Sequence, residues 1–188
     1  MISLINSPSI VIRLARSQDR QKIIQLETLA MQTLCRDRYN RTQINHLITK
    51  IPLLRFNDEI VVVAEQDDRL IGFASLLRDR AFLRTLYVQP KFLACNLDLR
   101  LLWAIEQEAR KLRIKTLRVT STLPEKDFYN AQGYQDVGCC NLTKMDILVP
   151  GVAMQKTLNS AAQGKVVSFC RRTITATLPS ALFLLVAL

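Results

Sequence analysis

At 188 residues, with 49% apolar and 22% charged residues, the chain suits one globular domain and favours neither a disordered chain nor a membrane protein. A formal net charge of +10 favours anionic partners, such as nucleotide phosphates, nucleic acids or an acidic membrane surface. Because the basic residues are spread from Arg13 to Arg172 and no nucleic-acid module is recognisable, we expect no nucleic-acid partner.

The first third of the chain predicts one strand and two helices. A short β-branched run at residues 10–14 predicts the strand, and Ser17 begins a stretch of side-chain oxygens suited to a helix start. Apolar residues at helical spacing then predict an amphipathic helix at about 19–34. A second helix is predicted at about 42–50, with Pro52 ending it.

An antiparallel hairpin follows. The continuous β-branched run at 60–64 predicts its first strand, residues 66–69 form the turn, and residues 70–77 form the second strand. Gly72 lies inside that second strand, where a glycine marks a bulge or close packing.

The next stretch reads strand, loop, helix, strand. The apolar run Phe82–Val88 predicts a strand that stops at Gln89-Pro90, and a loop at 91–96 leads into a helix ending at about Leu112. A further strand is predicted at 116–121.

The last predicted elements are a short helix and two strands. Pro124 opens the helix, which carries Phe128-Tyr129 and is closed by Gly133-Tyr134, and the strands lie at 135–141 and 152–158. Residues 159–188 end in an apolar run that is too short to span a bilayer. They form either an added helix or strand on the core or an anchor for a membrane or a partner.

Two motifs in this order of elements carry a family resemblance. Leu86-Tyr87-Val88-Gln89-Pro90 and Phe128-Tyr129-Asn130-Ala131-Gln132-Gly133-Tyr134 resemble the cofactor-binding half of the GNAT superfamily of acetyl-CoA-dependent N-acetyltransferases. The resemblance covers about residues 10–158. It implies a domain at 1–158 with an α/β (α+β) GNAT fold, in which a mixed, mostly antiparallel sheet of six or seven strands is flanked by helices. Residues 159–188 are an extension of unknown role.

The resemblance also implies a coenzyme site. The pantetheine arm of acetyl-CoA would pair with the main chain of Leu86, Tyr87 and Val88, and Thr122 stands where the family usually has an asparagine. Tyr129 would be the general acid for the departing thiolate, because a phenol can donate a proton at neutral pH. Phe128 and Tyr129 can equally be plain core aromatics.

The implied pyrophosphate loop departs from the family pattern, which is rich in glycine. The matching positions, none of them glycine, are Leu93, Ala94, Cys95, Asn96, Leu97 and Asp98. Asn96 tolerates the left-handed conformation and can replace a glycine or cap the helix. Asp98 is an ordinary first-turn acid, but its charge would oppose a pyrophosphate unless its side chain turns away; Lys91 and Arg100 are the nearest cations that can offset it.

The sequence shows no general base for the acceptor amine. The strand positions that often carry a carboxylate in the family are Arg84 and Thr85, and we expect the single histidine, His46, to be solvated. Substrate specificity in this fold comes largely from the first two helices, where Arg36, Arg38 and Arg41 would favour an anionic acceptor.

We therefore expect an N-acetyltransferase that uses acetyl-CoA as co-substrate and a small-molecule or protein amine as acceptor, with no metal and with a homodimer as one possible assembly. The alternative is a catalytically inactive GNAT-fold binding or regulatory module. Five cysteines without paired spacing predict reduced, mostly buried thiols. The first eight residues lack the features of a secretory signal, so we expect a cytoplasmic protein.

Overall fold

The computed structural model describes residues 9–34, 41, 45, 59–122, 125–141 and 150–158. The tail at 159–188, Pro124, His46, Arg36 and Arg38 lie outside the described residues. So does most of the predicted second helix at 42–50. Arg41 and Asn45 are described, and both are helical and exposed.

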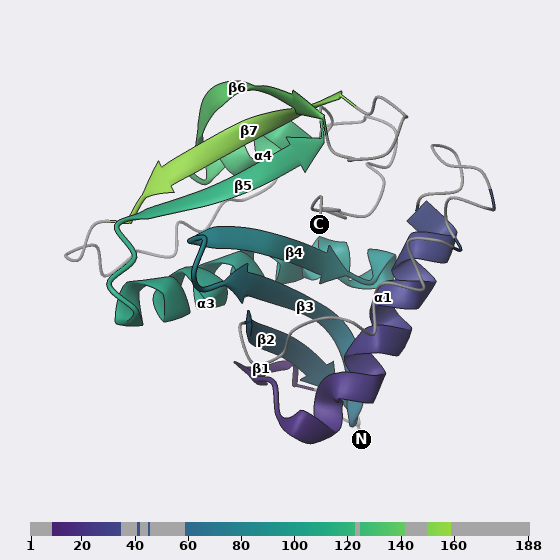
Figure 1. Cartoon of the computed structure of the whole chain (residues 1–188). Helices are drawn as coiled ribbons and strands as arrows, with labels where there is room; N and C mark the ends of the chain where they lie inside the picture. Colours follow the sequence, from purple (N-terminus) through teal and green to yellow (C-terminus); the bar gives the residue numbers. More distant parts are fainter. Residues whose placement is uncertain are drawn as a thin grey trace, which may run out of the picture.

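The described part of the chain forms one seven-stranded sheet in the order β1-β2-β3-β4-β5-β7-β6 (Figure 1). Its strands are β1 (Val11–Leu14), β2 (Glu59–Gln66), β3 (Arg69–Leu77), β4 (Phe82–Val88), β5 (Thr116–Thr122), β6 (Gln135–Asn141) and β7 (Pro150–Thr157). All neighbours pair antiparallel except β4 and β5, which are parallel. The predicted mixed, mostly antiparallel sheet with flanking helices is confirmed.

The described helical elements are η1 (Ser17–Asp19), α1 (Arg20–Leu34), η3 (Pro90–Cys95), α3 (Leu97–Lys111) and α4 (Lys126–Ala131). The predicted first helix therefore begins with a 3-10 turn. The helices α1, α3 and α4 lie close to their predicted positions, whereas the predicted loop at 91–96 is largely a 3-10 helix. The last turn of α3 carries Arg110 and Lys111, and positive charges are stabilising near a helix C-terminus.

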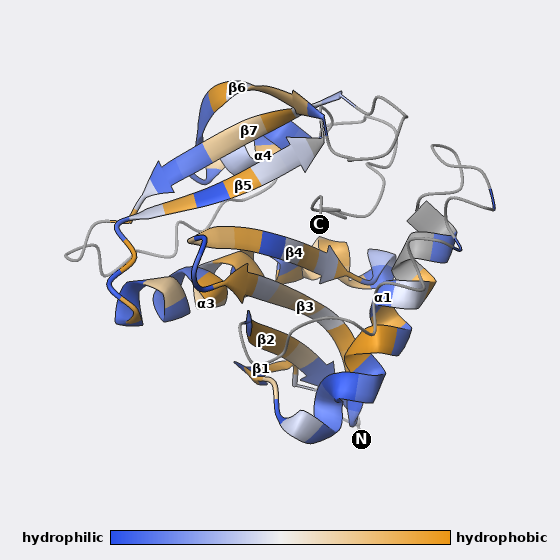
Figure 2. Ribbon diagram, viewed as in Figure 1, coloured by the Kyte–Doolittle hydropathy of each residue, from blue (hydrophilic) through white to orange (hydrophobic). Residues whose placement is uncertain are grey.

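Helices α1 and α3 cover opposite faces of the sheet. Successive side chains of a strand point to opposite faces. In β2, Val62 and Ala64 belong to the apolar cluster that contains the buried face of α3, whereas Val61 and Val63 are buried outside that cluster. Ile23 of α1 is also buried outside it, and α1 packs on β3. Figure 2 shows the largely apolar strands between the two helices.

Gly72 combines both roles predicted for it. A Cβ at this position would lie 2.8 Å from the Tyr87 carbonyl oxygen and 3.0 Å from Leu101 Cδ1, so the absent side chain allows α3 to pack closely on β3. The pairing register of β2 and β3 also shifts beside it, between Ala64 and Glu65.

The expectation of mostly buried thiols is wrong for the cysteines that the structure describes. Cys95 and Cys139 are exposed and Cys140 is half-buried, and all three are free. Cys139 is exposed because β6 is the edge strand of the sheet and almost all of its residues face solvent. Cys95 ends η3, in which no residue is buried.

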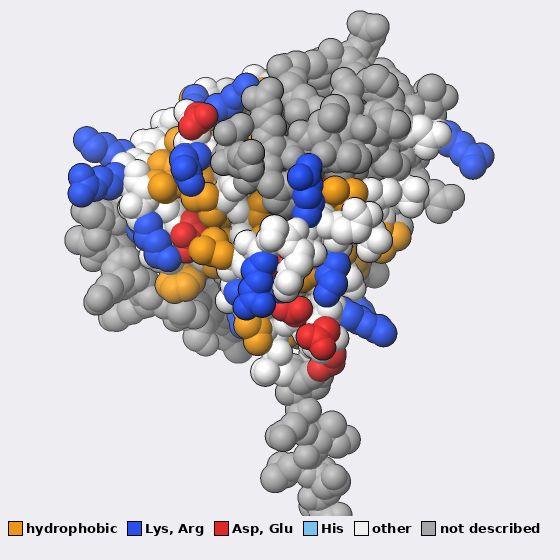
Figure 3. Space-filling model, turned by 60° about the horizontal axis from the view of Figure 1, so that its bottom comes forward, with side chains coloured by type: hydrophobic (Ala, Val, Ile, Leu, Met, Phe, Trp, Pro, Cys, Tyr) orange, Lys and Arg blue, Asp and Glu red, His pale blue; other side chains and the backbone are white. Residues whose placement is uncertain are grey.

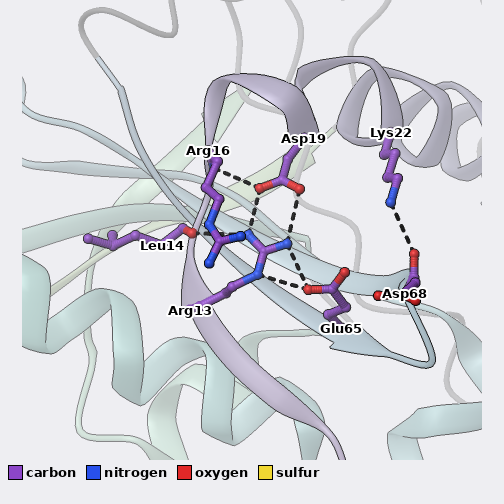
Figure 4. A network of polar contacts seen from close by, with 7 residues as sticks. All are labelled: Arg13, Leu14, Arg16, Asp19, Lys22, Glu65 and Asp68. Atoms are coloured by element: carbon purple, nitrogen blue, oxygen red, sulfur yellow. Dashed lines mark hydrogen bonds and ion pairs between the residues drawn. The ribbon is translucent and has the colours of Figure 1, made fainter.

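A partly buried ion-pair network fixes the start of the first helix to the sheet (Figure 4). Arg13 on β1 donates from both terminal nitrogens to the Asp19 carboxylate, at 2.6 and 3.0 Å, and its Nε donates to Glu65 Oε2 at 2.8 Å. Asp19 also accepts from the Arg16 backbone N–H at 2.7 Å. These bonds lower the pKa of Asp19, with the hydrogen bond from Arg13 as the largest cause.

Asp19→Asn should lower the free energy of unfolding at pH 7 by about 1.5–3 kcal/mol, because it removes charge-assisted bonds from a buried position. Since folding lowers the pKa of Asp19, the wild type keeps this contribution above pH ~4 and loses it as the pH falls further. Denaturant unfolding at pH 7 and at acid pH measures both effects. Asp68→Asn is the control and should change neither, since Lys22 Nζ contacts the Asp68 backbone carbonyl rather than its side chain.

Candidate functional site

Strands β4 and β5 pair over only two residues and then separate. Phe82 pairs with Arg118 and Leu83 with Val119, and no described strand pairs with this edge of β4 beyond Leu83. On its other edge β4 continues to pair with β3 as far as Val88. Figure 1 shows the two parallel strands diverging. The main chain of β4 from Arg84 to Val88 can therefore accept an extended ligand as an additional strand.

A bulge in β4 decides which main-chain groups face this open edge. Ser75 pairs with Thr85 and Leu76 with Leu83, which leaves Arg84 as the extra residue. The Gln89 N–H donates to the Ile71 carbonyl of β3 at 2.9 Å.

Main-chain groups alternate between the two edges of a strand. The main chain of Tyr87 is therefore directed toward β3, like that of Gln89. The main chains of Leu86 and Val88 are directed toward the open edge. Three residues are expected to pair with a pantetheine arm, and two of them have main-chain groups directed toward the open edge. The third, Tyr87, packs its ring against Phe73 with centroids 6.3 Å apart.

The loop after β4 is a 3-10 helix followed by one left-handed residue. Asn96 has φ 52° and ψ 35°, as predicted for an asparagine in place of a glycine. Its side chain makes no capping bond, so the alternative of a side-chain cap is wrong. Ala94, Cys95 and Asn96 are exposed, and α3 begins directly after them. The first N–H groups of a helix lack acceptors within the helix and favour an anion.

Asp98 turns into the protein rather than onto this exposed loop. Its side chain is only 6% exposed, and its Oδ1 accepts from the Leu99 N–H at 2.9 Å. It also lies close enough to Tyr129 that its negative charge raises the pKa of that phenol. The sequence predicts that the charge of Asp98 opposes a pyrophosphate at this loop. Because the carboxylate is buried, this repulsion is reduced. Leu97 is likewise fully buried, so only its main chain faces the loop.

Tyr129 is a fully buried phenol on α4. Its ring contacts Phe128 and Tyr134 edge-to-face, with centroids 5.0 and 5.4 Å apart. Its hydroxyl has no hydrogen-bond partner among the described residues. Burial raises its pKa well above the ordinary value, and the charges of Glu125 and Asp98 raise it further. The phenol is therefore protonated at neutral pH and has a proton available for a ligand atom.

Glu106, which the sequence did not single out, holds Tyr134 in place beside Tyr129. The Tyr134 hydroxyl donates to Glu106 Oε1 at 3.2 Å, and Lys156 Nζ of β7 donates to both carboxylate oxygens at 2.7 and 2.9 Å. Glu106 thus connects α3 to β7 on the far side of the separated strands. The sequence feature that could have identified Glu106 is its position as an acidic residue within the apolar stripe of α3, next to Ile105 and near Ala109.

Glu106→Gln should lower the free energy of unfolding by about 3 kcal/mol, because it leaves the Lys156 ammonium in a partly buried position without its counter-charge. Glu108→Gln on the same helix removes an ion pair to the exposed Lys111 and should cost less than about 0.5 kcal/mol. Urea unfolding of both variants measures the difference. Equal effects would show that the Glu106 network does not hold α3 and β7 together.

Thr122 contributes a main-chain position only, as far as the structure describes it. It pairs with Gly151 of β7 at the end of β5, and its side chain lies outside the described residues.

Figure 3 shows Lys and Arg side chains dispersed over one face of the molecule, with Asp and Glu between them. Among the described helices, none has both the length and the apolar character needed to cross a membrane. The described residues also contain no group of three or more His, Cys, Asp or Glu side chains arranged for a metal ion.

Comparison with known proteins agrees with this geometry. Residues 35–158 match the family described as an acetyltransferase (GNAT) domain. A search of the curated proteins found no match.

Several solved structures share the fold. The GCN5-related N-acetyltransferase from Rhodopseudomonas palustris has 19% identity and a TM-score of 0.66, over 81% of this chain and 97% of that chain. The PaiA N-acetyltransferase from Thermoplasma acidophilum, in complex with coenzyme A, has 22% identity and a TM-score of 0.65, over 79% and 99%. The aminoglycoside 6'-N-acetyltransferase from Enterococcus faecium has 17% identity and a TM-score of 0.61, over 79% and 97%.

Proposed function

Because the chain belongs to the GNAT family of acetyltransferases, we propose that it transfers the acetyl group of acetyl-CoA to a primary amine of a small molecule or protein. The observation that carries this proposal is the open edge of β4, which begins at Arg84 and leads directly into the loop and the start of α3. One end of this edge suits an extended amide-containing arm, and the other suits phosphates.

In this proposal the pantetheine arm of the coenzyme lies along β4, and its pyrophosphate lies at the loop that follows β4. The main chains of Leu86 and Val88 pair with the pantetheine arm, and the backbone of Leu93, Ala94, Cys95, Asn96, Leu97 and Asp98 faces the pyrophosphate. Lys91 and Arg100 are exposed near this loop and add positive charge. Since the loop follows Val88, the thioester end lies toward Arg84. Thr122, at the end of β5, is a further proposed coenzyme contact.

Tyr129 is the proposed general acid. The amine nitrogen attacks the thioester carbonyl carbon, the carbon–sulfur bond breaks, and the Tyr129 hydroxyl donates its proton to the departing thiolate. Its raised pKa keeps the phenol protonated at neutral pH before the thiolate forms, although the same shift makes it a weaker acid than an ordinary tyrosine. Its hydroxyl has no partner among the described residues, which leaves it available to the sulfur atom as negative charge develops there.

Tyr129→Phe should lower turnover by about 100-fold or more, the usual contribution of a general acid, with little change in acetyl-CoA affinity. Thiol release from acetyl-CoA, with spermidine, kanamycin and an unblocked peptide as trial acceptors, measures turnover, and calorimetry measures affinity. An unchanged rate would remove Tyr129 from the mechanism.

Measurements of stability distinguish a catalytic role of Tyr129 from a purely structural one. Tyr129→Phe should keep the thermal midpoint or raise it, because the lost hydroxyl has no described partner. Tyr134→Phe is the matched control and should cost about 1.5–3 kcal/mol, because it removes the hydrogen bond to the charged Glu106.

The second candidate is a binding or regulatory module that has lost catalysis. The absence of glycine at residues 93–98 favours it, because side chains there limit how closely backbone N–H groups approach a phosphate. Calorimetric titration distinguishes the two candidates. The enzyme proposal requires binding heat and a thermal shift with millimolar acetyl-CoA, and the absence of both would reject it.

We further propose that the protein acts in the cytoplasm. The three described cysteines are free thiols and two of them are exposed, which suits a reducing compartment.

A further inference from the structure

A buried cluster of charges lies on the α1 face of the sheet, at the bulge of β4. Arg84 Nη1 lies 3.2 Å from Glu59 Oε1, and Arg84 Nη2 lies 3.8 Å from Glu27 Oε1. The exposed fractions of the three side chains are 11% for Arg84, 4% for Glu59 and 3% for Glu27. Both acids therefore lie beside the same cation.

Glu27 is the less well satisfied of the two acids. It lies on α1 beside the buried Leu26 and near the buried Ile23. Its contact with Arg84 is long, and its Oε2 has no hydrogen-bond partner among the described residues. A buried carboxylate oxygen without a donor destabilises the fold. The ammonium group or N–H of an amine would supply the missing donor.

The position of this cluster matches the proposed direction of the coenzyme. Arg84 is the bulged residue at which the open edge of β4 begins, and the thioester end would lie toward it. The opposite face of the sheet is filled by the apolar cluster that contains α3. The face that carries α1 and Glu27 is then the one from which an acceptor amine would approach.

We propose that Glu27 is the general base of the reaction and that Arg84 positions it, a proposal that rests on the acetyltransferase function proposed above. The Glu27 carboxylate takes one proton from the substrate ammonium, and the neutral nitrogen then forms the new bond to the carbonyl carbon. The carbon–sulfur bond breaks and the thiolate takes the Tyr129 proton. The nitrogen returns a second proton to Tyr129, and Glu27 releases its proton to water, so the products are the amide, the free thiol and one proton.

The ionisation of Glu27 suits this role. Burial raises the pKa of Glu27, the positive charge of Arg84 opposes this, and the negative charge of Glu59 adds to it, so that the pKa is raised to about 7. A carboxylate with a pKa near the working pH is ionised in a large fraction of molecules and is also a stronger base than an ordinary glutamate.

Glu27→Gln keeps the shape of the side chain and removes the base. With the trial amine that the wild type acetylates best among spermidine, kanamycin and an unblocked peptide, we expect kcat/KM to fall about 100-fold or more near pH 7. Acetyl-CoA affinity should not change. The wild-type rate should rise with pH through a limb near 7, whereas the variant should follow only the fraction of unprotonated amine in solution.

Glu59→Gln is the matched control because it changes the surroundings of the base but not the base itself. Removing the negative charge of Glu59 should move the acidic limb to lower pH without abolishing it. Glu27→Asp keeps a carboxylate and should retain both the limb and part of the rate.

The outcomes separate the two proposals. If the wild type does not bind acetyl-CoA, the acetyltransferase proposal fails. If the wild type is active and Glu27→Gln keeps its rate and acidic limb, the base proposal is overturned and the function stands. If Glu27→Asp is as inactive as Glu27→Gln while both bind acetyl-CoA, a carboxylate at this position is not sufficient and the base assignment is also overturned.

Discussion

The early end of the β4–β5 pairing is the constraint on which the rest of the structure depends. Two parallel strands that begin to pair at Phe82 and Leu83 would normally continue, because each further residue would satisfy main-chain groups. Here the bulge at Arg84 turns β4, while α3 packs beneath β2, β3 and β4. On the far side the Glu106–Lys156 ion pair holds β7 to the same helix. The separation is therefore supported from both halves of the sheet.

Buried polar groups around this separation fall into two kinds. Glu106 is fully provided with donors from Lys156 and Tyr134, and we interpret it as structural support. Tyr129 and Glu27 each have a buried oxygen without a partner in the described chain, which costs stability. A fold that accepts this cost favours a ligand at these two oxygens, and the two residues suit the opposite proton transfers of one reaction.

Local patterns in the sequence predicted most of the fold, because β-branched runs, helical spacing and turn residues act over a few neighbours. They also predicted the left-handed Asn96, whose side chain suits that conformation. They could not show that Asp98 turns inward or that the bulge falls at Arg84, since both depend on packing between distant segments. The proximity of Glu27, Glu59 and Arg84 was invisible for the same reason. The roles of the coenzyme-loop residues, Thr122 and Tyr129 remain predictions.

The central claim, that the open edge of β4 receives the coenzyme, is tested most directly by amide hydrogen exchange with and without saturating acetyl-CoA. The account predicts slower exchange at Leu86 and Val88, whose main chains face the open edge, and little change at Tyr87, whose main chain faces β3. Unchanged exchange at both Leu86 and Val88, with acetyl-CoA bound, would contradict it.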